Sequence, residues 1–193
     1  TITKYKPEFT INGTDIDFGK DEVITFETKD IITSLVTVEV NGENHTTFIK
    51  DGKGSLTLPG LSAGDYNITL YFPASERYES AIAKNNFTVS QITPDIYIDV
   101  QNITYGETET IVVYVNAKGN VTIKVGDEYL AIEEPIVDGV VSVDVSGLNA
   151  TDYTVNVTYN GNANFTVNSA ETIFTVDKAD PIISVDVENI VYG

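Results

Sequence analysis

The sequence repeats itself every 87 residues without an insertion or a deletion. Pro7 recurs as Pro94 and Pro181, and the Leu and Asp-Tyr of residues 61–66 recur within residues 148–153. The match continues to the close of the repeat, where residues 87–89 (FTV) return as residues 174–176. A period of this length indicates a tandem array in which each repeat is one structural unit.

The repeat divides the chain into four segments. Residues 7–93 and 94–180 are two complete repeats, and each has the size of a domain that can bury its own core. Residues 1–6 match the end of a repeat, and residues 181–193 match the beginning of one. We therefore expect residues 1–6 to close a preceding repeat and residues 181–193 to supply the first strand of a following repeat.

Charge and cysteine content exclude several classes of partner and chemistry. Eleven Lys or Arg against 29 Asp or Glu give a net charge of −18, which repels nucleic-acid phosphates and anionic membrane surfaces. We expect no nucleic-acid partner and, without a long apolar run, no direct membrane insertion of these residues. The sequence has no Cys, so disulfides, thiolate metal sites and a cysteine nucleophile are excluded.

Short segments in which apolar and polar residues alternate recur in both repeats, as expected for strands with one buried face. They are residues 36–40, 55–58, 66–70 and 87–89 in the first repeat, and 121–125, 142–145, 153–157 and 174–176 in the second. Turn-forming pairs such as Asn41-Gly42, Asp51-Gly52 and Asp138-Gly139 separate them. The pattern predicts an all-β fold of tandem Ig-like β-sandwich domains, with about seven strands each, arranged end to end.

A tyrosine at the start of an apolar strand supports the Ig-like fold. Tyr66 and Tyr153 each follow a turn-ending leucine, Leu61 and Leu148, by five residues. This is the position of the tyrosine corner, in which the phenol hydroxyl bonds backbone a few residues upstream. The alternative is that both tyrosines are ordinary core aromatics.

The segments that contain these tyrosines resemble a known family. Residues 54–70 (GSLTLPGLSAGDYNITL) and 144–159 (DVSGLNATDYTVNVTY) are similar to the Ig-like repeats of the adhesin-like surface proteins of methanogenic archaea, which are related in pattern to bacterial Ig-like repeats. The resemblance covers essentially the whole chain. It implies an archaeal, extracellular, cell-surface setting, and it supplies no catalytic residue.

The linkers between repeats are short and contain proline, which leads to a hypothesis about function. Pro94 and Pro181 have a restricted φ, so successive sandwiches should form a semi-rigid rod whose partners are the neighbouring repeats. We expect a stalk or shaft segment of a long surface adhesin-like protein that projects a binding element. As alternatives, the domains themselves bind a glycan or a partner-cell protein through loops such as residues 73–81 and 160–168, or assemble with other copies into a surface filament.

Asn-x-Thr sequons are unusually frequent, and they predict a glycoprotein. Asn is disfavoured in strands, so its recurrence two residues before Thr indicates selection for a glycan acceptor. The alternative is strand patterning, because six of the nine sequons have Ile, Val or Phe in the middle. The nine acceptor residues are Asn12, Asn44, Asn67, Asn86, Asn102, Asn120, Asn149, Asn156 and Asn164.

The sequence offers little for catalysis or for a cofactor. Its only histidine, His45, is expected in an exposed loop and has no counterpart in the second repeat, so we predict neither an enzyme nor a cofactor. The alternative is calcium at a junction between repeats. Its candidate oxygen ligands are Asp15 and Asp17, with Asp177, Asp180 and Asp186 around the second junction.

Overall fold

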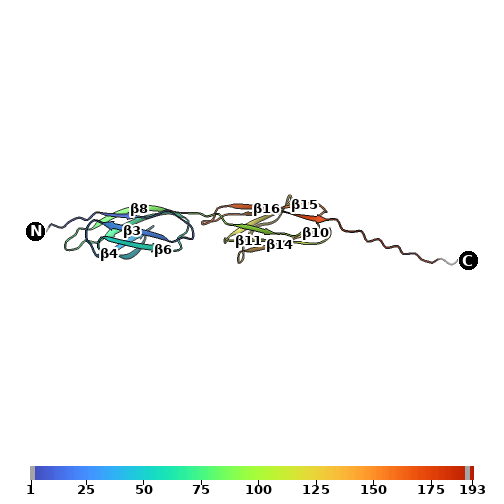
Figure 1. Ribbon diagram of the computed structural model, residues 1–193, viewed down its shortest axis with the longest axis horizontal. Helices are drawn as coiled ribbons and strands as arrows, with labels where there is room; N and C mark the ends of the chain where they lie inside the picture. The colour runs from blue at the N-terminus through green and yellow to red at the C-terminus, as the bar shows by residue number, and fades with distance from the viewer. Residues whose placement is uncertain (1–2, 190–191) are drawn as a thin grey trace. The chain divides into compact units, whose positions relative to one another are not determined.

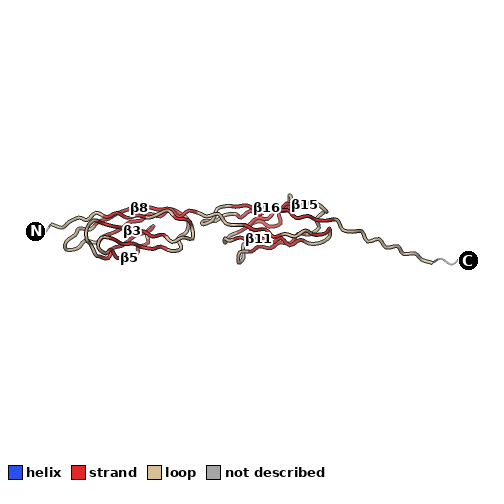
Figure 2. Tube along the Cα trace, viewed as in Figure 1, coloured by secondary structure: helices blue, strands red, loops and turns tan. Residues whose placement is uncertain are grey.

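The computed structural model describes residues 3–189 and 192–193 and divides the chain into two compact units. Unit 1 runs to Thr93 and also includes Asn162–Thr166, whereas unit 2 comprises Pro94–Gly161 and the chain from Val167 onward. The described residues form sixteen strands and no helix (Figures 1 and 2). The predicted all-β fold is confirmed.

Unit 1 is a sandwich of two sheets. The three-stranded sheet has the order β1-β3-β6 and the five-stranded sheet the order β2-β8-β7-β4-β5. β2 and β8 pair in parallel. The strands are β1 (Phe9–Asn12), β2 (Ile16–Asp17), β3 (Glu22–Thr28), β4 (Ser34–Val40), β5 (Glu43–Ile49), β6 (Lys53–Leu58), β7 (Gly64–Phe72) and β8 (Ala81–Ser90).

Unit 2 repeats this topology, with sheets β14-β11-β9 and β10-β16-β15-β12-β13. Its strands are β9 (Ile96–Asp99), β10 (Ile103–Thr104), β11 (Glu109–Val115), β12 (Asn120–Val125), β13 (Glu128–Pro135), β14 (Val140–Val145), β15 (Asp152–Tyr159) and β16 (Asn168–Asp177). The bounds of β9, β10, β11, β14 and β16 fall 87 residues after those of their counterparts. Each unit thus has one strand more than predicted, because β2 and β10 are too short to show alternation.

β12 is displaced from β4 by only 85 residues, because Ile123 pairs with Val157 as Val38 pairs with Leu70. The expectation of a repeat without an insertion or a deletion is therefore wrong here, and the irregular pairing of β12 with β13 precedes the return to the 87-residue spacing.

The inward-facing side chains of the two sheets form a separate core in each unit. In unit 1, Ile24 on β3 and Val38, Ile68 and Leu70 on the opposite sheet are fully buried. In unit 2, Ile111 and Ile123 occupy matching positions. Burial of an aliphatic side chain contributes about 1.5–3 kcal/mol, so each unit is stabilised by its own alternating strands.

The predicted hairpin turns have the backbone conformation that their sequences favour. Asn41-Gly42, Asp51-Gly52 and Asp138-Gly139 all have positive φ at both residues, between 47° and 89°. A two-residue type I′ turn requires this conformation, which Asn, Asp and Gly tolerate best. The turn at Asn41-Gly42 places β4 against β5 and fixes the register of that hairpin. The two Asp-Gly turns instead carry the chain from one sheet to the other, between β5 and β6 and between β13 and β14.

A buried glutamate holds the crossing between the two sheets in each unit. Glu22 and Glu109 begin β3 and β11 and are only 1% and 3% exposed. The Glu22 Oε1 atom accepts a hydrogen bond from the Thr14 N–H at 2.7 Å, and Glu109 Oε1 accepts one from the Gln101 N–H at 2.6 Å. Thr14 and Gln101 lie where the chain crosses from one sheet to the other, so the carboxylate replaces the missing strand partner.

The chain enters and leaves each unit at opposite ends of its last strand. In unit 1, Tyr5 hydrogen-bonds residues 77 and 79, just before β8 begins, and the chain leaves after Ser90, where β8 ends. In unit 2, the Pro94 carbonyl accepts a hydrogen bond from Asn168 Nδ2 at the start of β16, which ends at Asp177. Both strands have ten residues and span about 33 Å.

Residues 178–189 form no strand in the structure. Ile182, Ile183, Val185 and Val187, which continue the alternating pattern, are at least 76% exposed. Residues 190–191, which also belong to the predicted first strand of a following repeat, lie outside the described residues. The assignment of residues 181–193 to a following repeat stays a prediction.

Replacing Glu109 by Ala should destabilise unit 2 by about 1–3 kcal/mol, because the Gln101 N–H would lose its acceptor in a partly buried position. Glu109→Gln keeps an oxygen at that point and should retain most of the stability. Calorimetric unfolding of the whole chain measures both variants, with the exposed Glu134→Ala as control. Equal stability of Glu109→Ala and the wild type would show that the hydrogen bond is dispensable.

Candidate functional sites

The two predicted corner tyrosines each hydrogen-bond the backbone four residues upstream. In unit 1 the Tyr66 hydroxyl donates to the Ser62 carbonyl at 2.9 Å. In unit 2 the Tyr153 hydroxyl accepts from the Asn149 N–H at 3.1 Å. Both bonds have the sequence separation expected of a tyrosine corner, although the hydroxyl has the opposite role in the two units.

The corner rings also pack against the last strand of their units. Tyr66 stacks on Phe87 with ring centroids 5.1 Å apart, and Tyr153 stacks on Phe174 at 5.7 Å. Leu61 is half-buried against the core of unit 1, and Leu148 is half-buried in unit 2. The tyrosine therefore joins the turn before β7 or β15 to the strand beside it.

The three repeated prolines have different environments. Pro7 and Pro94 are buried within their units, and the Pro94 carbonyl accepts the Asn168 hydrogen bond at 2.8 Å. Pro181 is exposed in the segment without strands. Pro94 is thus anchored to the start of β16, and its predicted effect on hinge motion remains to be measured.

Most sequon asparagines are accessible on the folded chain. Asn156 and Asn164 are half-buried, and the others are exposed, namely Asn12, Asn44, Asn67, Asn86, Asn102, Asn120 and Asn149. Asn67 on β7 and Asn86 on β8 are direct cross-strand partners.

Two sequon asparagines have a structural role that needs no glycan. Asn102 Oδ1 accepts a hydrogen bond from the Thr175 N–H at 2.9 Å, as Asp15 Oδ1 does from the Thr88 N–H at 2.7 Å in unit 1. Within unit 1, Asn164 Oδ1 accepts from the Ala63 N–H at 2.9 Å. Strand patterning and a backbone contact therefore explain part of the asparagine content.

The acidic residues considered for calcium are not gathered into one site. Asp15 bonds backbone and Asp17 forms an exposed ion pair with Lys20 at 3.0 Å. Asp177, Asp180 and Asp186 are exposed. Over the described part of the chain, no three His, Asp or Glu side chains are placed to hold a metal ion. The expectation of no cofactor stays a prediction.

The position predicted for His45 is wrong. His45 is half-buried within β5, opposite Val38, rather than in an exposed loop. The reason is the two-residue turn at Asn41-Gly42, which lets β5 begin at Glu43 and include the polar run around the histidine.

Two tyrosine hydroxyls have raised pKa values. A hydrogen bond to the Glu39 carboxylate, at 3.1 Å, raises the pKa of Tyr71 on the surface. Burial raises the pKa of Tyr159, whose hydroxyl donates to the Lys118 carbonyl at 2.8 Å. Both shifts favour the neutral phenol, so neither group is prepared to act as a base.

A surface groove occurs at the same place in both units, beside the first strand and the end of the third. It measures about 460 Å³ in unit 1 and about 360 Å³ in unit 2. Sequence reasoning missed this groove, because it is formed by residues far apart in the chain. The polar lining of unit 1 includes Glu8, Thr10, Glu27 and Lys29, and the equivalent residues of unit 2 are Asp95, Tyr97, Tyr114 and Asn116.

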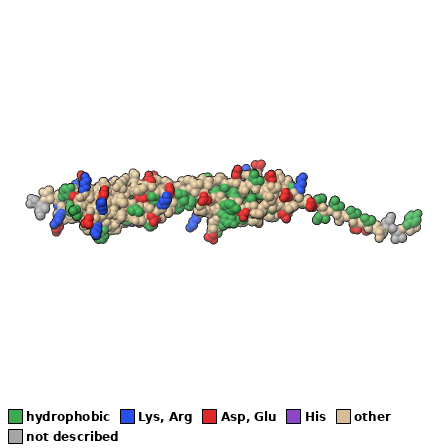
Figure 3. All heavy atoms as spheres, in the orientation of Figure 1, with side chains coloured by type: hydrophobic (Ala, Val, Ile, Leu, Met, Phe, Trp, Pro, Cys, Tyr) green, Lys and Arg blue, Asp and Glu red, His purple; other side chains and the backbone are tan. Residues whose placement is uncertain are grey.

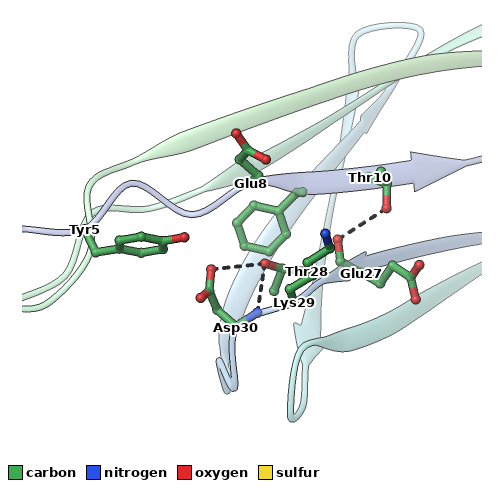
Figure 4. Close-up of a pocket in the computed structure, with 8 residues that line it drawn as sticks. Tyr5, Glu8, Thr10, Glu27, Thr28, Lys29 and Asp30 are labelled. Atoms are coloured by element: carbon green, nitrogen blue, oxygen red, sulfur yellow. Dashed lines mark hydrogen bonds between the residues drawn. The ribbon is translucent and has the colours of Figure 1, made fainter.

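The carboxylates around the groove of unit 1 do not converge. Glu8, Glu27 and Asp30 point in different directions (Figure 4). Asp30 instead bonds its neighbour Thr28, through hydrogen bonds of 3.3 and 3.4 Å. This groove therefore lacks the paired acid and base that hydrolytic chemistry requires.

The aromatic residues of the two loops considered for binding take part in packing. Tyr78 makes edge-to-face contacts with Tyr5 and Phe72, with centroids 6.3 and 6.2 Å apart. Phe165, which belongs to unit 1, makes a similar contact with Phe18 at 5.4 Å. These rings stabilise the fold, and binding through the two loops stays a prediction.

The sequence matches no known protein family and no characterised protein. Among solved structures, titin domains Z1Z2 in complex with telethonin cover 92% of this chain and 100% of their own, with 14% identity and a TM-score of 0.51. This likeness shows the tandem Ig-like fold alone.

Two weaker likenesses have TM-scores below 0.5. The fibronectin(III)-like modules of Clostridium thermocellum CbhA have 13% identity and a TM-score of 0.39, covering 94% of this chain and 100% of theirs. A bacterial ice-binding adhesin has 15% identity and a TM-score of 0.41, covering 92% and 66%. None of the described residues forms a helix that could cross a membrane.

Replacing Tyr153 by Phe should destabilise unit 2 by about 0.5–1 kcal/mol, because the Asn149 N–H loses its acceptor while the ring stack with Phe174 remains. Thermal unfolding of the whole chain measures the change. Tyr105→Phe, at a tyrosine that is 56% exposed, is the control. If Tyr153→Phe and Tyr105→Phe melt alike, the corner hydroxyl contributes nothing to stability.

Proposed function

We propose that this chain is a structural stalk segment of a long extracellular adhesin-like protein, similar to those on the surface of methanogenic archaea. Its role is to hold a binding element of the parent protein away from the cell. The observation that supports the proposal is the placement of chain entry and exit at opposite ends of β8 and of β16.

Opposite entry and exit points make a domain an effective spacer. Each unit carries the chain along the full length of a ten-residue strand, which is about 33 Å. A domain with adjacent termini would add mass to an array but little reach. Since each unit also has its own core, stability in such an array is set repeat by repeat.

The surface charge suits a chain that stays separate from its neighbours. The net charge of −18 is distributed over both repeats, with −7 for residues 7–93 (6 basic, 13 acidic) and −11 for residues 94–180 (3 basic, 14 acidic). Like-charged copies repel one another, which opposes assembly into a filament and favours solvated single chains.

The maximum dimension of the protein should increase by a fixed amount with each added repeat. Inserting a second copy of residues 94–180 after residue 180 should lengthen the maximum dimension in small-angle X-ray scattering by about 33 Å or more. The control carries a flexible Gly/Ser insert of the same length, which should give a broad distribution of dimensions instead. An added repeat that leaves the maximum dimension unchanged would contradict the stalk.

We further propose that the exposed sequons carry N-glycans. The solvent-facing asparagines of β7 and β8 support this, because Thr or Lys would solvate the same strands at lower conformational cost. Glycans on these faces would also shield strands from proteolysis and from pairing with other chains.

Peptide mass spectrometry of protein from the native host should find glycan masses at exposed sites such as Asn67, Asn86 and Asn120. Occupancy should be lower at Asn156 and Asn164, which are half-buried. Protein expressed in a bacterial cytoplasm that lacks a glycosylation system provides the unmodified reference. Unmodified peptides at all nine sequons of the native protein would remove this proposal.

A further inference from the structure

One end of the outer face of the three-stranded sheet differs in chemistry between the two units. In unit 2 five positions on and beside β9, β11 and β14 form what we call the tyrosine face, and all five are apolar or aromatic. They are Tyr97, Val112, Tyr114, Val137 and Val140, and the equivalent residues of unit 1 are Thr10, Thr25, Glu27, Lys50 and Lys53.

The two tyrosines lie side by side on adjacent strands. Tyr97 on β9 and Tyr114 on β11 are direct cross-strand partners, with ring centroids 6.0 Å apart and planes inclined by 39°. Val140 on β14 is the partner of Tyr114 on its other side, so the three residues form one row across the sheet. Tyr97 is 64% exposed and Tyr114 is 44% exposed.

The fold does not require this apolar row. Unit 1 has the same strands and the same register, and there Glu27 is paired with Thr10 and Lys53. Single exposed apolar residues are common, but a contiguous group at positions that the same fold fills with polar or charged residues indicates a binding surface. Figure 3 shows hydrophobic side chains gathered on unit 2, in the region where Figure 1, drawn in the same orientation, labels β11.

Hydrogen-bonding groups lie at the edge of this surface. The groove of about 360 Å³ is lined by Tyr97 and Tyr114 together with Asp95 and Asn116. Asn116 Nδ2 donates to Asp95 Oδ2 at 2.9 Å, and the Asp95 N–H donates to Asn116 Oδ1 at 2.8 Å. These two bonds hold the carboxylate and the amide in place beside the rings, with acceptor and donor positions left for a ligand.

We propose that the tyrosine face binds a neutral oligosaccharide. A sugar ring has an apolar face of C–H groups that can lie on an aromatic ring, and a rim of hydroxyls that need donors and acceptors. Tyr97 and Tyr114 supply two adjacent aromatic surfaces, and Asp95 and Asn116 supply the polar contacts at the edge. This activity goes beyond a stalk and does not depend on one.

The charges of unit 2 select among possible ligands. With 3 basic and 14 acidic residues in the second repeat, sulfated or sialylated glycans and phosphate-bearing lipids would be repelled. A cation is a weaker match than a sugar, because two rings on an open sheet do not enclose it. A row of apolar surface with polar groups beside it matches the faces and edges of a sugar chain.

The test grafts the residues of unit 1 onto unit 2. The Tyr97→Thr/Tyr114→Glu variant carries residues that the same strands already accommodate at Thr10 and Glu27, so it should fold. The wild-type chain and this variant are applied to a printed array of neutral, sulfated and sialylated glycans. Saturation-transfer NMR with the strongest neutral binder then gives affinities. Thr10→Tyr/Glu27→Tyr is the reciprocal variant, which should gain binding in unit 1.

The wild type should bind neutral glycans, and the grafted variant should lose about tenfold or more in affinity because two ring contacts are removed. Equal binding by the wild type and the grafted variant would overturn the proposal. So would the lack of any neutral binder, or binding confined to anionic or amino-bearing glycans. Sedimentation that shows wild-type dimers and monomeric Tyr97→Thr/Tyr114→Glu, without sugar binding, would assign the face to a second copy instead.

Discussion

The packing of inward-facing side chains from two sheets is the interaction on which this molecule depends. Without cysteine, neither unit can be held by disulfides, so the fully buried residues such as Ile24, Ile68, Ile111 and Ile123 must supply its stability. This core determines which face of every strand is buried. It thereby leaves the opposite face free to change without loss of the fold, as the comparison between Glu27 and Tyr114 shows.

The features that could be predicted from the sequence are those with a local or periodic signal. Alternation predicted the strands, the Asn-Gly and Asp-Gly pairs predicted the turns, and Tyr66 and Tyr153 predicted the corners. Each depends on residues within a few positions of one another, so a single sequence contains the information. The error at His45 has the same origin, because a polar run was taken for a loop although a two-residue turn precedes it.

The features that could not be predicted depend on contacts between distant residues. In the sequence of an acidic chain, Glu22 cannot be told from the exposed carboxylates around it. Its repetition as Glu109, again before an apolar run, was a signal that could have predicted its burial. The groove and the tyrosine face require β9, β11 and β14 to be adjacent, and Tyr97 and Val140 are 43 positions apart in the sequence. Register is set by the fold and not by any local pattern.

A comparison of the two repeats also shows which residues the fold needs and which belong to one unit alone. Positions that keep their chemistry in both units, such as the buried glutamate and the corner tyrosine, have a structural role visible in their hydrogen bonds. Positions that change from polar or charged to aromatic or aliphatic on an exposed face cannot be explained by the same fold. Since the chain passes through each unit along its last strand, the outer face of the three-stranded sheet is not needed to continue the array. In the proposed stalk, one repeat can therefore acquire a binding surface without any loss of the length that it spans.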